Sequence, residues 1–281
     1  MRRNGRFSFF LFARHIGLVV AALASTAGCN NDLSSGSNSS SSSNSTNASA
    51  AGIWTGVDSA TGLALIGFVD SNGQADFILA DGVQFTGTAQ AAGTALAISL
   101  EGYPQFGAQF SDGSTYGVGT FNGSVSSGNS ISGTLSLTTS DNTTSTSSWS
   151  LTFSSLYDTA SPLSAVAGTY ADSASAVSAG LDPLSGASVT ISSTGAISSQ
   201  GGANGCVLNG TVSNGDSSYD VYEVAYTYEN CTGTYATLNG VQFTGLADNN
   251  PNESPAEVVV GATGENSTGT YYGVVLALTI S

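Results

Sequence analysis

From residue 51 onwards, short runs of alternating apolar and polar residues are separated by turn residues at intervals of roughly 8–12 positions. This pattern is typical of β-strands that bury one face, and it predicts an all-β fold. The clearest turn, Asn72-Gly73, lies between the alternating segments 63–69 and 76–80 and predicts a hairpin with a type I′ turn. Two further turns that predict hairpins are Gly128-Asn129 and Thr194-Gly195.

The two halves of the chain repeat each other. Residues 51–54 match 167–170, 82–89 match 205–212, 121–125 match 243–247, and 150–153 match 277–280. Four matches in the same order indicate a duplication. A competing alignment remains open, because Gly-Val-Gln-Phe-Thr-Gly occurs at both 82–87 and 240–245.

The duplication predicts two β domains, at residues 51–156 and 165–281, with about eight strands in each. Gly87, in the middle of a predicted strand, suits a bend in a sheet that closes on itself. We therefore expect two tandem small antiparallel up-and-down barrels or barrel-like sandwiches, and a single long sandwich is the alternative. Residues 172–179 are the one candidate for a helical turn.

The amino end has the pattern of an export signal, assigned to residues 1–28. A basic start is followed by apolar residues and then by small residues at 25–28, directly before Cys29. The uninterrupted apolar run is well short of the ~20 residues that a membrane span needs. Residues 33–50 are almost entirely Ser, Asn, Thr, Ala and Gly, so 29–50 is expected to be a flexible, disordered tether.

The charged residues divide at Cys29. The four Lys+Arg and the single His all precede it, and the 19 Asp+Glu all follow it, which gives 0 − 19 = −19 for the chain after residue 28. Without Lys or Arg that part of the chain cannot neutralise phosphates, which excludes nucleic acid as a partner. Without His it cannot form a Ser-His-Asp site, a Cys-His site or an imidazole metal site. Carboxylate or tyrosine chemistry, oxygen-ligated calcium and binding without catalysis remain possible.

The remaining cysteines, Cys206 and Cys231, form an even pair in an exported chain. This favours a disulfide, and two free thiols are the alternative.

Tyr222, Tyr226 and Tyr228 occupy one face of a predicted strand. They could line a barrel interior and bind an apolar ligand or a sugar, or they could simply fill the core. Residues 70–76 have oxygen-bearing side chains at alternate positions, faintly like a calcium loop, but hairpin turn chemistry already explains them. The sequence predicts no cofactor and no metal site.

Hydrolysis of a glycoside needs two carboxylates within about 10 Å of each other. Glu223 and Glu229 share a strand face but lie roughly 20 Å apart along it. The pairs Asp70 with Asp76 and Glu253 with Glu257 have spacings that do not require proximity. No catalytic residue is therefore assigned.

Three motifs resemble known families. Ala27-Gly28-Cys29 resembles the lipobox of bacterial lipoproteins, with Thr26 where that family usually has Leu. The resemblance implies cleavage before Cys29 and a diacylglycerol on its sulfur, and the following Asn30 implies sorting to the outer membrane. Gly52-Ile53-Trp54 resembles the G-x-W signature of lipocalin-like (calycin) barrels. Residues 205–247, with G-C-x-x-x-G, a Tyr-rich strand, a second Cys and F-x-G-x-A, look like uncharacterised tandem β-barrel lipoproteins of proteobacteria.

These observations predict a lipid-anchored lipoprotein of the outer membrane, facing the periplasm or the cell surface. We expect a non-enzymatic binding, adhesive or structural module with the membrane and an extracellular or periplasmic protein or glycan as partners. The alternatives are a carboxylate-dependent glycan hydrolase and a carrier of a small apolar ligand in the second barrel.

Overall fold

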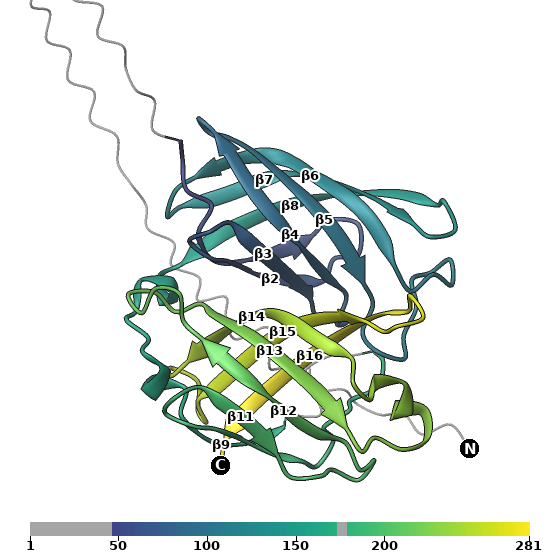
Figure 1. Cartoon of the computed structure of the whole chain (residues 1–281). Coiled ribbons are helices and arrows are strands. Elements are labelled where there is room, and N and C mark those ends of the chain that lie inside the picture. The colour runs from purple at the N-terminus through teal and green to yellow at the C-terminus, as the bar shows by residue number, and fades with distance from the viewer. Residues whose placement is uncertain (1–46, 173–178) are drawn as a thin grey trace, which may run out of the picture.

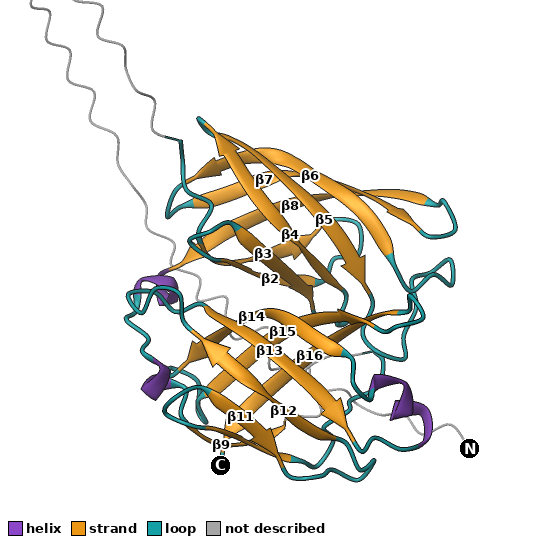
Figure 2. Ribbon diagram, viewed as in Figure 1, coloured by secondary structure: helices purple, strands orange, loops and turns teal. Residues whose placement is uncertain are grey.

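The computed structural model describes residues 47–172 and 179–281. This part of the chain forms two closed antiparallel barrels in tandem, each of eight strands (Figures 1 and 2). The predicted fold of two small up-and-down barrels is confirmed. The export signal, Cys29, most of the tether and residues 173–178 of the predicted helical turn lie outside the described residues.

In the first barrel each strand pairs with the next one along the chain, and β1 pairs with β8 to close the sheet. Its strands are β1 Gly52–Asp58, β2 Ala64–Val69, β3 Gln74–Leu79, β4 Gln84–Ala92, β5 Ala95–Tyr103, β6 Gly117–Ser126, β7 Ser130–Thr139 and β8 Thr144–Ser154. Two short 3₁₀ helices, η2 Ser155–Asp158 and η3 Leu163–Ala165, lead to the second barrel.

The second barrel has the same topology and closes through the pairing of β9 with β16. Its elements are β9 Gly168–Asp172, β10 Ser188–Ile191, β11 Ala196–Ser199, β12 Val207–Ser213, β13 Tyr222–Glu229, η4 Gly233–Leu238, β14 Gln242–Asn250, β15 Glu257–Glu265 and β16 Tyr271–Ile280. Over the described ranges, no helix is long and apolar enough to cross a membrane.

Strand order decides between the two alignments of the halves. The matched segments fall at the first, fourth, sixth and eighth strand of both barrels. The competing match of 82–87 with 240–245 would instead align the fourth strand of one barrel with the sixth of the other. The structure therefore supports the alignment in which 82–89 corresponds to 205–212.

One hydrogen bond recurs at the start of each barrel. Trp54 Nε1 donates to the carbonyl oxygen of Ala50 at 2.9 Å, and Tyr170 Oη donates to that of Val166 at 2.8 Å. Both rings are buried, and both reach the residue four positions earlier in the chain. The tryptophan of the G-x-W motif thus has a tyrosine counterpart with the same local role.

In four strands, a glycine lies two residues after an apolar side chain that points into the barrel. Neighbouring strands approach each other closely at these glycines. A Cβ at Gly87 would lie 1.8 Å from the carbonyl oxygen of Ser99. At the corresponding positions Gly123, Gly210 and Gly245, a Cβ would lie 2.1, 2.3 and 1.9 Å from a carbonyl oxygen. These strand pairs can come together only because the side chain is absent.

The predicted hairpin of β2 and β3 forms, but its predicted turn type is wrong. A type I′ turn needs positive φ at both central residues, whereas only Gly73, with φ 87°, has it. The Asp70 carboxylate accepts the backbone N–H groups of Asn72 and Gln74 at 2.9 and 2.7 Å. These bonds stabilise a longer turn with glycine in the left-handed conformation.

Each barrel has its own interior core, and a third apolar cluster lies between the barrels. The outer faces of β2 and β3 provide one side of this contact, with Ile66, Phe68 and Ile78. The outer faces of β14, β15 and β16 provide the other, with Leu246 and residues further along. Figure 1 shows these strands facing each other across the junction.

Candidate functional site

The tyrosines that the sequence marked as candidate ligand contacts fill the second barrel. Tyr222, Tyr226 and Tyr228 point inwards from β13 and are fully buried. Tyr226 stacks on Phe243, with ring centroids 5.4 Å apart and planes 11° apart. Burial raises the pKa of Tyr222 to about 12.

The space left inside the second barrel is about 20 Å³ and is lined by apolar residues and by the rings of Tyr222 and Tyr226. That volume holds about one water molecule. The folded barrel therefore has no room for a small apolar ligand, and its interior gives no support to a carrier.

The carboxylates considered from the sequence lie in separate environments. Glu223 and Glu229 lie on the outer face of β13, and the Asp70 carboxylate accepts backbone hydrogen bonds within the β2–β3 turn. Asp76 is buried between the barrels, as described below. Burial, and then the charge of Glu253, raises the pKa of the buried Glu257.

The structure brings together carboxyl pairs that the sequence did not indicate. One of them, Asp112 and Asp141, shares the hydroxyl of Thr139 as hydrogen-bond donor. Asp172 and Asp182 lie within hydrogen-bond reach of each other, and burial together with Asp182 raises the pKa of Asp172 to about 8. Direct contact is closer than the ~5 Å or more that separates the two carboxylates of glycosidases. The pair can share a proton, but it does not have the spacing of a glycoside hydrolase.

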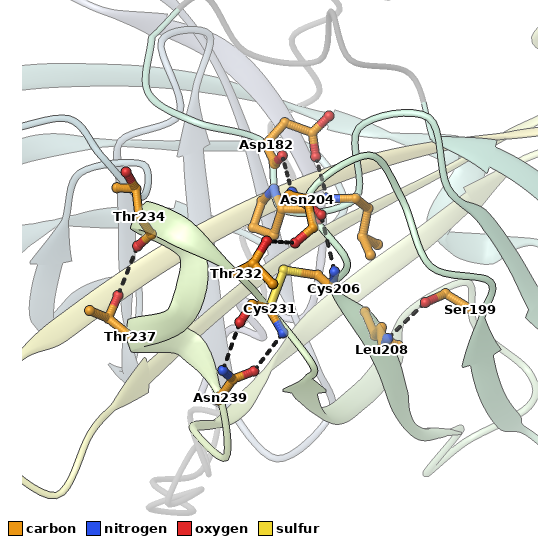
Figure 3. Close-up of a disulfide and its surroundings, with 12 residues drawn as sticks. Asp182, Ser199, Asn204, Cys206, Leu208, Cys231, Thr232, Thr234, Thr237 and Asn239 are labelled. Carbon is orange, nitrogen blue, oxygen red and sulfur yellow. Dashed lines mark hydrogen bonds between the residues drawn. A yellow bond between two sulfur atoms is a disulfide. The ribbon is translucent and has the colours of Figure 1, made fainter.

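The predicted disulfide between Cys206 and Cys231 is present, and it joins the strand ends of β12 and β13 (Figure 3). Asn239 holds the second cysteine from both sides, accepting its N–H at 2.8 Å and donating to its carbonyl oxygen at 3.0 Å. Asn204 donates to the carbonyl oxygen of Pro183 at 2.8 Å and so fixes the loop that carries Asp182. The disulfide therefore stabilises this end of the second barrel.

A groove of about 210 Å³ lies where the barrels meet. One wall is the connection between β5 and β6, and the other is the hairpin between β15 and β16. The inter-barrel groove is lined by Pro104, Gln105, Phe106, Gly107, Ala108, Gln109, Thr115, Thr270, Tyr271 and Tyr272. Figure 1 shows the β15–β16 hairpin reaching the loops of the first barrel at this point.

Hydrogen bonds from both barrels fix the floor of the groove. Gln105 Oε1 accepts the backbone N–H of Val275 at 2.9 Å, and its Nε2 donates to the carbonyl oxygen of Leu181 at 3.2 Å. The Phe106 N–H donates to the carbonyl oxygen of Gly273 at 2.7 Å. The β5–β6 connection is thus held in place before any ligand arrives.

A tyrosine cluster supports one wall of the groove. Tyr271 stacks on Tyr116 with centroids 4.0 Å apart and planes 16° apart. Glu101 accepts hydrogen bonds from the hydroxyls of Tyr103 and Tyr116 at 2.6 and 3.0 Å. Burial, and then Glu101, raises the pKa of both phenols, so they stay protonated at neutral pH.

The groove lining contains no charged side chain. The rings of Phe106, Tyr271 and Tyr272 offer apolar surface, and the exposed side chains of Gln109 and Thr115 offer donors and acceptors. Among the described residues, no group of three or more His, Cys, Asp or Glu could hold a metal ion. The groove is suited to stacking and neutral hydrogen bonds rather than to acid–base or metal chemistry.

The groove is not apparent from the sequence alone. Its walls are separated by more than 150 residues along the chain, and the β5–β6 connection contains neither a charge cluster nor a recognisable motif. The one local signal was the density of aromatic residues at Tyr103, Phe106, Tyr271 and Tyr272.

No protein-family model, curated protein or solved structure matches this chain. Small barrels host many unrelated functions, so the fold alone assigns none. The features that bear on function are the groove and the amino-terminal sequence.

Proposed function

We propose that this protein is a lipid-anchored lipoprotein of the bacterial outer membrane that binds a neutral glycan, without catalysis, in the inter-barrel groove. The membrane is its partner through the anchor, and a glycan of the envelope or of the surroundings is its partner through the groove.

The amino-terminal sequence supports the anchoring. Every basic residue precedes Cys29, small residues precede it directly, and a Ser/Asn-rich segment follows it. Two or three acyl chains would hold the protein firmly, because a single chain binds membranes only marginally.

The observation that carries the binding proposal is the uncharged, aromatic lining of the groove. A phosphate or carboxylate ligand would need a cation, and no Lys, Arg or His follows residue 15. A neutral sugar needs an apolar ring face to stack on and uncharged donors and acceptors for its hydroxyls. Tyr271 is held by its stack on Tyr116, so little side-chain entropy would be lost when a ligand binds.

Binding is tested by calorimetry with a panel of neutral oligosaccharides. Tyr271→Ala is expected to weaken binding at least tenfold, because it removes the main stacking surface. Tyr219→Ala is the matched control: Tyr219 stacks on Tyr157 at 4.5 Å, beside the apolar contact between the barrels but outside the groove, so it also tests whether disturbing that contact is enough to weaken binding. Equal effects of the two substitutions, or no binding by the native protein, would refute the proposal.

Anchoring is tested separately by metabolic labelling with radioactive palmitate. Cys29→Ala is expected to abolish labelling and release the protein from membranes. Digestion of intact cells with a protease that needs neither Lys nor Arg then shows which side of the membrane the barrels face. Release of shorter sugars from the bound oligosaccharide would instead favour the hydrolase alternative.

A further inference from the structure

A buried acid lies in the contact between the two barrels. Asp76 points outwards from β3, is 1% exposed, and has no hydrogen-bond partner of normal geometry for either carboxyl oxygen in the described structure. Its neighbours on the first barrel are Phe68 and Thr86, its cross-strand partners on β2 and β4.

The second barrel approaches this carboxyl with its backbone. A Cβ at Gly261 of β15 would lie 2.6 Å from Asp76 Oδ2, so glycine is needed for the contact. The backbone at Leu246 of β14 also lies close and favours the carboxylate, but this effect is smaller than that of burial. The same outward faces of β14 and β15 also carry the buried acids Asp248 and Glu257, whose pKa values are raised by burial, and Tyr226 inside the second barrel responds to the charge of Asp76.

A second buried polar group lies in the same contact. Gln84 of β4 is fully buried, and neither of its side-chain polar atoms has a hydrogen-bond partner in the described structure. Its Nε2 lies 3.0 Å from the position of a Cβ on Gly273 of β16. Unpartnered polar groups oppose burial, because both recover hydrogen bonds to water when the surface is exposed.

We propose that the contact between the two barrels is a proton-dependent joint, closed while Asp76 is protonated and shifted towards separated barrels when Asp76 ionises. This joint extends the proposed function. Its effect on ligand binding depends on glycan binding in the groove, whereas the joint itself does not. The walls of the groove come from different barrels, so separation would dismantle the groove and release its ligand.

The sign of the effect follows from burial. In the closed arrangement burial raises the pKa of Asp76 from the ordinary 3.8 to about 8, whereas in separated barrels the carboxyl is hydrated. The closed arrangement is therefore favoured most below about pH 4. Each pH unit between roughly 4 and 8 lowers the ratio of closed to open molecules by up to about tenfold.

The joint is tested by small-angle X-ray scattering of the full mature chain carrying Cys29→Ala, from pH 5 to pH 9. The radius of gyration is expected to increase with pH. The increase should be much smaller in Asp76→Asn, which keeps the shape of the side chain without its charge. Asp172→Asn is the matched control, because the pKa of Asp172 is also raised to about 8, but it lies on β9, outside the contact.

A constant radius in the unsubstituted chain, or the same increase in Asp76→Asn, would overturn the joint. Far-ultraviolet circular dichroism at each pH verifies that both barrels stay folded. If Asp76→Asn does not fold, Asp76→Ser provides the same comparison. Oligosaccharide binding at pH 5 and pH 8.5 is the separate arm: absence of binding at both pH values refutes the proposed function and leaves the scattering result standing.

Discussion

Replacing Gly87 by alanine tests whether close strand approach determines the barrel. A Cβ at this position would lie 1.8 Å from the carbonyl oxygen of Ser99, and real contacts of this kind stay above 3.0 Å. The strands must therefore separate by at least 3.0 − 1.8 = 1.2 Å. The obstacle is backbone in a closed sheet, so neither a rotamer change nor a free edge can relieve it.

Two opposing effects set the size of the change in stability. Alanine restricts the unfolded chain and so stabilises by about 0.4–1 kcal/mol. Overpacking costs about 1–3 kcal/mol, and a clash with backbone belongs at the upper end of that range or above it. We expect Gly87→Ala to lower the free energy of unfolding by about 2–3 kcal/mol and the Tm by roughly 10 °C.

Denaturant unfolding followed by tryptophan fluorescence measures this change selectively. The only two tryptophans, Trp54 and Trp149, are both buried in the first barrel, which also contains Gly87. Gln90→Ala is the control, because Gln90 is exposed on the same strand and the tryptophans report on the same barrel. A midpoint for Gly87→Ala equal to that of Gln90→Ala would show that the strand approach does not require glycine.

Three further predictions concern other parts of the chain. Replacing Cys206 and Cys231 by serine should lower the free energy of unfolding by about 3–4 kcal/mol, because the disulfide closes a loop with a sequence separation of 25 residues. Adding reductant should not change the stability of this double variant further. Tyr170→Phe should cost about 1 kcal/mol in chemical denaturation, because it removes the bond to the Val166 carbonyl; no change would mean that water replaces it. Burial raises the pKa of Asp220 to about 6, so its contribution to stability is complete below about pH 4 and is lost as the pH rises to about 6. Asp220→Asn should flatten the dependence of Tm on pH in this range, and an unchanged profile would contradict the prediction. It should also raise the free energy of unfolding at pH 7 by up to about 3 kcal/mol, because the pKa of Asp220 is about 6 in the folded protein and 3.8 when the side chain is hydrated.

The barrels and their duplication were predictable because their determinants are local. Alternation within each strand reports one buried face, and glycine-containing turns mark the strand ends. The side chains of Tyr222, Tyr226 and Tyr228 share a face because of the two-residue period of a strand, which is visible in the sequence. The disulfide followed from the parity of the cysteines and the export signal.

The contact between the barrels and the groove depend on long-range packing that local patterns do not encode. Gln105 of the first half forms a parallel bridge with Gly273 of the second, and nothing near either residue indicates its partner. A partial signal existed in residues 258–260 and 274–278, continuous apolar runs in a barrel whose outer face should be polar. Such runs indicate a strand buried on both faces. Asp76 was misleading, because an acid in an outward position of a hairpin usually faces solvent.

The first described residues join the first barrel at the end away from the groove. Residues 47–50, which the sequence placed in the tether, lie against the first barrel, where the Ala48 N–H donates to the carbonyl oxygen of Gly93 at 2.8 Å. Gly93 lies in the turn before β5, and the groove begins at Pro104, after the other end of this nine-residue strand, which is about 30 Å long. The point where the amino-terminal segment joins the first barrel and the groove therefore lie at opposite ends of that barrel. In the proposed lipoprotein the groove would be at the end of the first barrel remote from the point where the tether joins it, open to long polymers that pass the free end of the molecule.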